Sequence, residues 1–200
     1  MRLACRQLQN FYDFARVALQ FVEGQQTNVF SLKNNKTLKQ TLDHKRYTKL
    51  KAEVLDRYSR VLDEPLGHFL LDLKFEGDQF YRKFLNSYGD STFSTFRISD
   101  ALFQKMKGVY AYVVDNEVMY IGRCKDSMSK RINHGYGKIH PKNCYLDGQA
   151  TNCHLNARIT KVGNTTELWF RSFERLDEIA AVEQELIRAH NPPWNIHRYV

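Results

Sequence analysis

Residues 108–123 read GVYAYVVDNEVMYIGR, two short apolar runs on either side of a polar loop at 115–117. Valine and tyrosine favour strands, and two such runs around a short polar loop are typical of a β-hairpin. A three-residue loop brings Tyr110 opposite Gly122. Because side chains alternate along a strand, Tyr110 and Tyr120 then project from the same face as diagonal neighbours.

Two other interpretations of this hairpin stay open. A two-residue loop would put Tyr110 and Tyr120 on opposite faces. Both residues are also ordinary strand formers, so the pair alone does not define a site.

The residues after the hairpin predict the rest of a small domain. A helix is expected near 127–134, a third strand in ELWFRSF at 167–173, and a helix at about 176–189. Strand, strand, helix, strand, helix is an α+β order. We therefore expect an α+β fold for residues 101–200, with a small antiparallel three-stranded sheet flanked by helices.

Residues 1–100 are predicted to form a mostly helical, basic region. Apolar residues recur at helical spacing over 1–23 and again over 37–62, and a third helical stretch covers about 78–86. The segment 33–60 holds nine Lys and Arg against three Asp and Glu. Such a region could contact a phosphate backbone or form a dimer, and a solvated helix face is the alternative.

Composition indicates a globular chain with a polyanionic partner. The 200 residues are 42% hydrophobic and 26% charged, with a net charge of +8 and a pI near 9.3. No segment has the ~20 apolar residues that cross a bilayer, and the N-terminus lacks an apolar secretion signal. We expect a cytoplasmic protein without membrane contact, whose four cysteines are reduced thiols.

The helix at 176–189 carries an acid on its apolar stripe. The stripe runs through Ile179 and Leu186, and position 183 between them is a glutamate. An inward carboxylate without a partner costs several kcal/mol, so Glu183 requires a metal ion or a cationic side chain. An arginine-paired glutamate at the edge of the core is the simpler alternative.

Three further side chains are candidates for the same site. Arg131 and His134 stand at i and i+3 of the helix near 127–134, on one face, although surface placement is the commoner fate of such a pair. Two prolines end the last helix, and the carboxamide of Asn195 follows, where it could hold the loop in place.

Taken in order, these features resemble the GIY-YIG nuclease superfamily over about residues 107–197. The resemblance rests on GVY and YIG, the following arginine helix, and VEQELIRAHNPPWN. It implies that Tyr110 and Tyr120 are the two signature tyrosines. It also implies that Gly122 is the closing glycine, which allows backbone and substrate to approach.

The resemblance assigns roles to the remaining candidates. Arg131 matches the arginine that contacts the scissile phosphate, Glu183 the single carboxylate that binds the divalent cation, and Asn195 the residue that closes the site. Arg123 stands where some restriction enzymes of the superfamily carry a lysine.

One position departs from the pattern of the superfamily. A His or Tyr is usual four residues after the arginine, and here that residue is Gly135. Either the helix is locally shifted or the role has moved, with His134 at three residues and Tyr136 at five as the alternatives. Of the two, His134 is the preferred candidate.

The activity implied by the resemblance is Mg²⁺-dependent DNA cleavage, with Mn²⁺ as a substitute, in a restriction or other defence nuclease. Double-stranded DNA is the expected substrate, hydrolysed in line to leave a 5′-phosphate, with Tyr110 or His134 as general base. One site per chain suggests a homodimer or sequential nicking. The alternative is a non-catalytic nucleic-acid-binding or toxin-like module on a nuclease scaffold.

A zinc site is a weaker hypothesis from the same half of the chain. The residue types of zinc ligands occur at His140, Cys144, Cys153 and His154. Adjacent Cys153 and His154 and the absence of a CxxC motif argue against it. This stretch is expected to form a loop and a short helix over the substrate side of the sheet.

Overall fold

The computed structural model describes residues 1–5 and 10–196. The chain forms two compact units, each discontinuous in sequence. The first contains the described residues of Met1–Gly24, Ser94–Lys138 and Arg158–Val200, and the second contains Gln25–Phe93 and Ile139–Ala157. The division predicted near residue 100 falls within Ser94–Lys138, and both halves of the chain contribute to both units.

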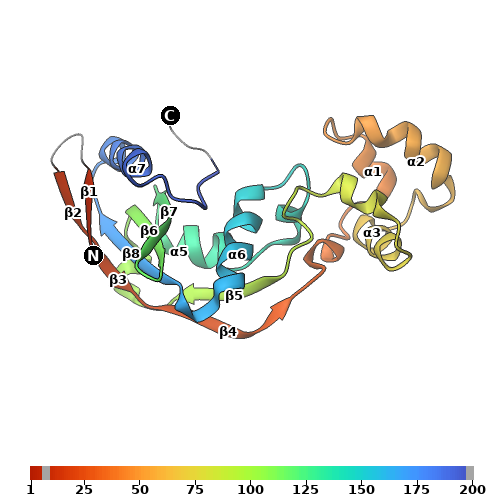
Figure 1. The fold of residues 1–200 in the computed structure, drawn as a ribbon. Coiled ribbons are helices and arrows are strands. Elements are labelled where there is room, and N and C mark those ends of the chain that lie inside the picture. Colours follow the sequence, from red (N-terminus) through yellow and green to blue (C-terminus); the bar gives the residue numbers. More distant parts are fainter. Residues whose placement is uncertain (6–9, 197–200) are drawn as a thin grey trace. The chain divides into compact units, whose positions relative to one another are not determined.

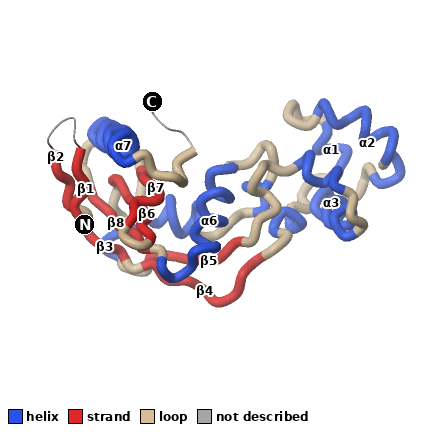
Figure 2. The backbone as a smooth tube through the Cα atoms, viewed as in Figure 1, coloured by secondary structure: helices blue, strands red, loops and turns tan. Residues whose placement is uncertain are grey.

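The first unit is built around an antiparallel four-stranded sheet in the order β3-β8-β6-β7. Its strands are β3 (Ala15–Val17), β8 (Glu167–Ser172), β6 (Gly108–Val114) and β7 (Glu117–Cys124). The α+β class and the three predicted strands are confirmed, but β3 adds a fourth strand. Figure 2 shows the strands in red gathered in this part of the chain.

Two further pairs of strands accompany the sheet. β1 (Arg2–Cys5) pairs antiparallel with β2 (Asn10–Asp13), and β4 (Leu19–Gln26) pairs with β5 (Phe93–Ile98). The helix predicted over 1–23 is therefore wrong, and residues 6–9 of that range lie outside the described residues. Pairing of β3 with β8 buries Val17, whereas Phe11 on the predicted apolar stripe is 64% exposed. Tertiary strand pairing thus overrode a helical period.

The β6–β7 hairpin has a two-residue turn in place of the predicted three-residue loop. Asp115 and Asn116 both have positive φ, 50° and 65°, as in the type I′ turns that join twisted strands. Val114 consequently pairs with Glu117. The loop prediction is wrong at this point.

A β-bulge restores the predicted register further along the hairpin. Met119 is the extra residue of β7, since the register shifts between Val113 and Tyr112 of β6. Beyond it Tyr112 pairs with Tyr120, and Tyr110 pairs with Gly122 as expected. The bulge therefore returns the tyrosines to one face despite the shorter turn.

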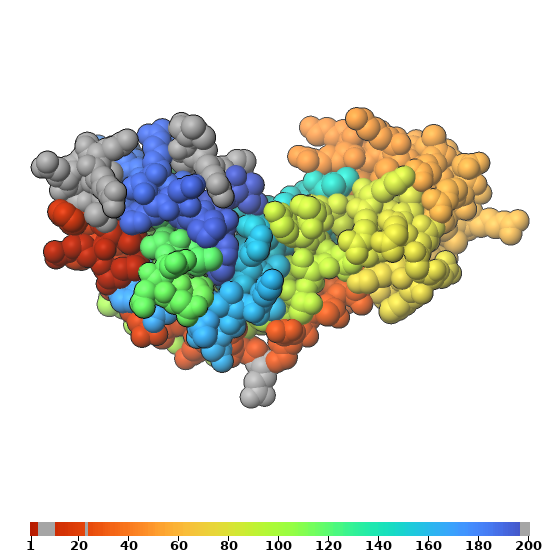
Figure 3. Space-filling model, viewed as in Figure 1, coloured from red at the N-terminus to blue at the C-terminus, as the bar shows by residue number. Residues whose placement is uncertain are grey.

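One long helix covers the other face of this hairpin. α7 (Leu176–His190) packs against β7, β6 and β1 (Figure 1), and its predicted range is confirmed within two residues. Figure 3 shows the red N-terminal segment beside the blue C-terminal one. The shared core contains Leu3, Val109, Ala111, Ile121, Ile179, Val182 and Leu186.

Short helices precede and follow the hairpin. α4 (Ala101–Gln104) leads into β6, and α5 (Met128–Arg131) continues as a π-helical turn over Ile132–Tyr136. The helix predicted near 127–134 is thus present with altered geometry. α6 (Ala150–Val162) begins in the second unit and ends in the first.

The second unit is mostly helical. It contains α1 (Leu38–Leu42), α2 (Lys51–Arg57) and α3 (Leu66–Phe75), with 3-10 turns between them and at Gln79–Phe84 and Pro141–Cys144. The single helix predicted over 37–62 is broken, and α3 was not predicted. Its core includes Phe30, Leu38, Val54, Leu70, Phe84 and Tyr145. In the described part of the chain, no helix is both long and apolar enough to cross a membrane.

Candidate functional site

The hairpin places a cluster of buried tyrosines on the sheet face opposite α7. The rings of Tyr110 and Tyr120 stack with centroids 6.1 Å apart, and Tyr112 lies 6.0 Å from Tyr110. Tyr110 and Tyr112 are fully buried and Tyr120 is 7% exposed. Close packing fixes the ring orientations, so the hydroxyl groups occupy defined positions.

Two donors converge on the Tyr110 hydroxyl oxygen. The Nε of Arg131, at the end of α5, donates to it at 3.3 Å, and the Tyr136 hydroxyl donates to it as well. The Arg131 guanidinium also lies over the Tyr136 ring, 5.2 Å from its centroid. Tyr110 is therefore the acceptor at the centre of a Tyr110–Arg131–Tyr136 group.

The π-helical turn explains why Tyr136 occupies this position. A π-turn adds one residue to a helical turn, so the fifth residue after Arg131 points where the fourth would point in an α-helix. His134 is exposed on the outside of the turn. Of the two alternatives raised by the sequence, the structure brings Tyr136 into the cluster and leaves His134 out.

Burial and neighbouring charge set the proton affinity of these hydroxyls. Burial raises the pKa of Tyr112, Tyr120 and Tyr136 well above the usual value. It also raises the pKa of Tyr110, but there the Arg131 charge and the donated hydrogen bonds oppose it. Of these four tyrosines, Tyr110 therefore has the best stabilised deprotonated form.

Gly122 allows the tyrosines to pack against the β7 backbone. A Cβ at this position would lie 2.5 Å from the Tyr110 hydroxyl and 2.6 Å from the Tyr120 ring. Any side chain here would displace both rings. Glycine is therefore required at position 122 because the two tyrosine side chains lie too close for a Cβ atom, and not because the backbone has a positive φ.

Glu183 faces inward from α7, as predicted from its stripe, and meets the edge strand β7. Its carboxylate is 3.1 Å from the guanidinium of Arg123, and the Glu183 side chain is 12% exposed. Burial raises the pKa of Glu183, and the charges of Arg123 and Arg131 oppose that rise. The backbone N–H of Arg123 also stabilises the carboxylate, which places Glu183 at the outer edge of β7.

Asn195 contacts the same edge of β7 at Ile121, two residues before Arg123. Its carboxamide accepts from the Ile121 N–H at 2.9 Å and donates to the Ile121 carbonyl at 2.8 Å. The backbone N–H of Trp194 donates a further hydrogen bond to the Met119 carbonyl at 2.8 Å. The C-terminal loop therefore covers an edge strand whose backbone groups would otherwise lack partners.

The edge of β7 is where the two parts of the site meet. Glu183 raises the pKa of Tyr120, and Arg131 lowers the pKa of Glu183. The geometry agrees, because Gly122 packs against the Tyr110 and Tyr120 rings and the next residue, Arg123, forms the ion pair with Glu183. The residues brought together are Tyr110, Tyr120, Gly122, Arg123, Arg131, Glu183 and Asn195, with His134 outside.

Sequence reasoning did not assign a place in the cluster to Tyr112, and it ranked Tyr136 second. Tyr112 shares the strand parity of Tyr110, so alternation alone could have found it. Tyr136 depends on a π-turn, for which the sequence offered only the glycine at position 135 as a hint. Both residues belong to the described tyrosine cluster.

The carboxylate at the β7 edge that could hold a hard cation is Glu183, which is paired with Arg123. Oxygen ligands suit Mg²⁺ and Mn²⁺, and Mg²⁺ retains several waters when bound. Among residues 1–5 and 10–196, no three His, Cys, Asp or Glu side chains gather as metal ligands. Water and substrate oxygens would have to complete the coordination of a cation at Glu183, and the cation would take the place of Arg123.

The four residues of the zinc hypothesis do not form such a group. The thiols of Cys144 and Cys153 lie 4.0 Å apart in the second unit, while the His140 ring caps the turn at Pro141–Cys144. His154 packs against the ring of Tyr88. These contacts are explained by packing and capping.

Comparison of the chain with models of known families, with curated proteins and with solved structures gave no match.

Proposed function

We propose that this chain is a metal-dependent DNA endonuclease of the GIY-YIG type. The observation that carries the proposal is the convergence of Arg131 and Tyr136 on the Tyr110 oxygen, beside a sheet edge that holds Glu183. A polarised hydroxyl, a fixed cation and a shielded carboxylate are the groups that phosphodiester hydrolysis needs. The net charge of +8 suits a polyanionic substrate.

Each residue has a distinct role in this proposal. Arg131 binds the scissile phosphate and stabilises the charge that develops on it. The phenolate form of Tyr110 would accept the proton of the attacking water, and Arg131 and Tyr136 stabilise that phenolate. Tyr120 holds the Tyr110 ring, and Asn195 holds the edge strand.

Glu183 is the proposed ligand of the cation. A bound Mg²⁺ supplies charge stabilisation for the leaving 3′-oxygen. With a cation on Glu183, Arg123 would no longer be paired with that carboxylate and would be available to a phosphate of the DNA.

A second candidate is a non-catalytic nucleic-acid-binding module. The Arg123–Glu183 ion pair favours it, because it satisfies the carboxylate without a metal ion. The raised pKa of Tyr110 favours it as well, because burial keeps the hydroxyl protonated.

The test is cleavage of supercoiled plasmid DNA with Mg²⁺ by the wild type and by Glu183→Gln. We expect nicked and linear products from the wild type and a rate lower by at least about 10²-fold for the variant. The matched control is Glu178→Gln, because Glu178 is an exposed acid of the same helix. Circular dichroism and thermal unfolding check that all three chains are folded.

The products also discriminate between the candidates. Discrete fragments from linear DNA would support a restriction or defence role, and a smear would indicate cleavage without sequence preference. If the folded wild type binds duplex DNA but leaves it intact with Mg²⁺ and with Mn²⁺, the binding module replaces the endonuclease.

A further inference from the structure

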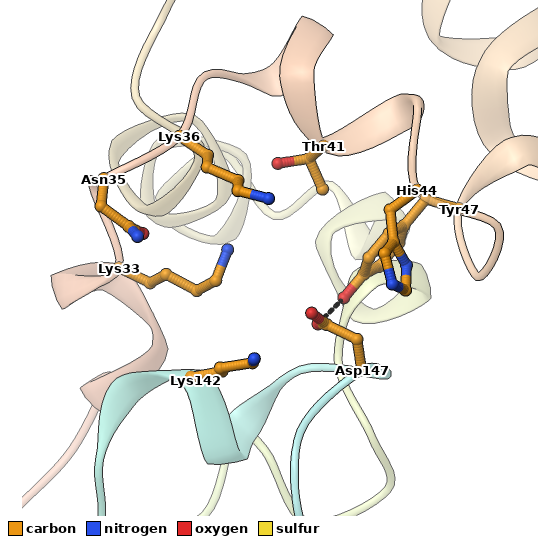
Figure 4. Close-up of a pocket in the computed structure, with 8 residues that line it drawn as sticks. All are labelled: Lys33, Asn35, Lys36, Thr41, His44, Tyr47, Lys142 and Asp147. Atoms are coloured by element: carbon orange, nitrogen blue, oxygen red, sulfur yellow. Dashed lines mark hydrogen bonds between the residues drawn. The ribbon is translucent and has the colours of Figure 1, made fainter.

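A small cavity in the second unit is lined by basic side chains. Its volume is about 80 Å³, and its lining residues are Lys33, Asn35, Lys36, Thr41, His44, Tyr47, Lys142 and Asp147. Figure 4 shows the ammonium groups of Lys33, Lys36 and Lys142 directed toward the same space. These residues come from the separate segments 33–47 and 142–147, so folding assembles the cavity.

Among the described residues, the three lysines form no direct ion pair, although Asp147 lies in the same cavity. None of their Nζ atoms lies within ion-pairing distance of a carboxylate in the described part of the chain. Burial lowers the pKa of Lys33, the charge of Asp147 opposes this, and the charges of Lys36 and Lys142 add to the lowering. Three ammonium groups that repel one another favour a bound anion.

One acid in the cavity is already engaged. The Tyr47 hydroxyl donates to the Asp147 carboxylate at 2.5 Å, and Tyr47 is only 1% exposed. Burial alone would raise the pKa of Asp147, but this hydrogen bond and the charges of Lys33 and Lys142 hold it below the usual value. Three lysines and one charged Asp147 leave the cavity with a net charge of +2.

Packing and hydrogen bonds hold part of the cavity wall in place. Lys33 lies over the ring of Tyr145, 4.7 Å from its centroid, and the Tyr145 hydroxyl donates to the Phe30 carbonyl at 2.8 Å. The Thr41 hydroxyl donates to the Thr37 carbonyl at 2.9 Å. The wall at Lys33 and Thr41 is therefore preformed, whereas the exposed Lys36 and Lys142 become ordered when an anion binds.

We propose that this cavity binds the phosphate group of a phosphate monoester. A monoester carries about −1.5 to −2 at neutral pH, which matches the cavity charge. A cavity of 80 Å³ holds more than one water, yet it is well below the ~300 Å³ of sites that enclose whole ligands. The phosphate enters, and the molecule that carries it remains outside.

Two sources share this chemistry: a small phosphorylated metabolite such as a nucleotide, and the 5′-phosphate at a nucleic-acid end. The inference does not rest on the proposed function, because the cavity lies in the second unit and the tyrosine cluster in the first. Binding is measured in EDTA, so that the outcome is independent of DNA cleavage.

The experiment is titration of the full chain with inorganic phosphate, a nucleoside 5′-monophosphate, and one oligonucleotide bearing either a 5′-phosphate or a 5′-hydroxyl. The test variant is Lys36→Gln with Lys142→Gln, and the control is Lys39→Gln with Lys49→Gln. All four lysines are exposed, and the control residues lie outside the cavity lining. Both double variants remove two charges, so non-specific electrostatics change equally.

We expect the test variant to bind phosphate about tenfold or more weakly, since phosphate–lysine bonds are charge-assisted, and the control to keep its affinity within about twofold. A preference for the 5′-phosphate oligonucleotide that only the test variant loses would identify a nucleic-acid end as the source. Binding of phosphate and nucleotide without that preference would identify a small metabolite. Absence of binding, or an equal loss in both double variants, would overturn the proposal.

Discussion

Asn195 makes two backbone hydrogen bonds with one residue of an edge strand, so its side chain substitutes for a neighbouring strand. Both bonds are buried and join positions 74 residues apart in the sequence. An Ala side chain would leave the N–H and C=O of Ile121 unsatisfied. The stability of the β7 edge should therefore depend on this single carboxamide.

We predict that Asn195→Ala lowers the free energy of unfolding by about 2 kcal/mol. Urea denaturation monitored by circular dichroism measures the change. The control is Asn164→Ala, because Asn164 is exposed in a surface turn. Equal stability of the two variants would show that the loop is held by other contacts.

Asp147 gives a residue-level prediction in the second unit. Its pKa is lowered in the folded chain, so its charge stabilises the fold above the usual pKa of 3.8 and that stabilisation is lost as pH falls below it. Asp147→Asn should cost about 1–2 kcal/mol at pH 7, since a bond from Tyr47 to a charged acceptor is weakened and the lysines lose their counter-charge.

The same comparison is repeated at lower pH. The difference between wild type and Asp147→Asn should shrink once the pH falls below 3.8, as the native carboxylate takes up its proton. Asp56→Asn is the control, since Asp56 is exposed on α2. A difference that does not change with pH would mean that Asp147 acts through packing.

At the scale of elements, the hairpin and the helix after it each contain one extra residue. The bulge at Met119 restores the strand register that the two-residue turn had shifted. The π-turn at Ile132–Tyr136 accommodates Gly135, so that Tyr136 takes the position that the fourth residue after Arg131 would have in an α-helix. The sequence predicted that Tyr110 and Tyr120 share a face, because alternation is a local property. It could not place Tyr136, because a π-turn is stabilised by the tertiary contacts of its side chains.

Deletion of Gly135 tests whether the π-turn is a one-residue insertion in an α-helix. Removing Gly135 should convert the turn to an α-helix that brings Tyr136 to the fourth position after Arg131. We expect the stability of this variant to stay within about 1 kcal/mol of wild type, since π-bulges behave as single insertions in α-helices. Calorimetric unfolding measures it.

The control deletion removes Ala157 from α6, where no π-turn can absorb it. The residues that follow would rotate by about 100°, which misplaces the buried Ile159 and Thr160. Equal losses for the two deletions would contradict the account of the turn.

At the scale of the whole molecule, the two units are each assembled from distant segments. β3 joins β8 across some 150 residues, and the loop at Pro141–Cys144 returns to the helical unit. Local periodicity predicted β6, β7, β8 and α7, whose patterns lie within short windows. Local periodicity assigned residues 1–23 to a helix because strand pairing with other segments, such as that of β3 with β8, leaves no local signal.

The overall charge of +8 belongs to this scale and predicts how DNA binding responds to salt. Affinity for duplex DNA in EDTA should fall by roughly 10³-fold between about 50 and 200 mM salt if six phosphates are neutralised. Fluorescence anisotropy at a series of salt concentrations gives the slope. Binding that is insensitive to salt would rule out phosphate contacts as its source.

The central claim is that the Tyr110 hydroxyl takes part in DNA hydrolysis, and Tyr112 provides a matched comparison. Both hydroxyls are buried on one strand, but in the described residues that of Tyr112 has no hydrogen-bond partner. The decisive measurement is the single-turnover rate of DNA cleavage with Mg²⁺ for Tyr110→Phe and Tyr112→Phe. We predict a loss of at least about 10²-fold for Tyr110→Phe and a rate close to wild type for Tyr112→Phe. Cleavage by Tyr110→Phe as fast as by Tyr112→Phe, with both chains folded, would contradict the account.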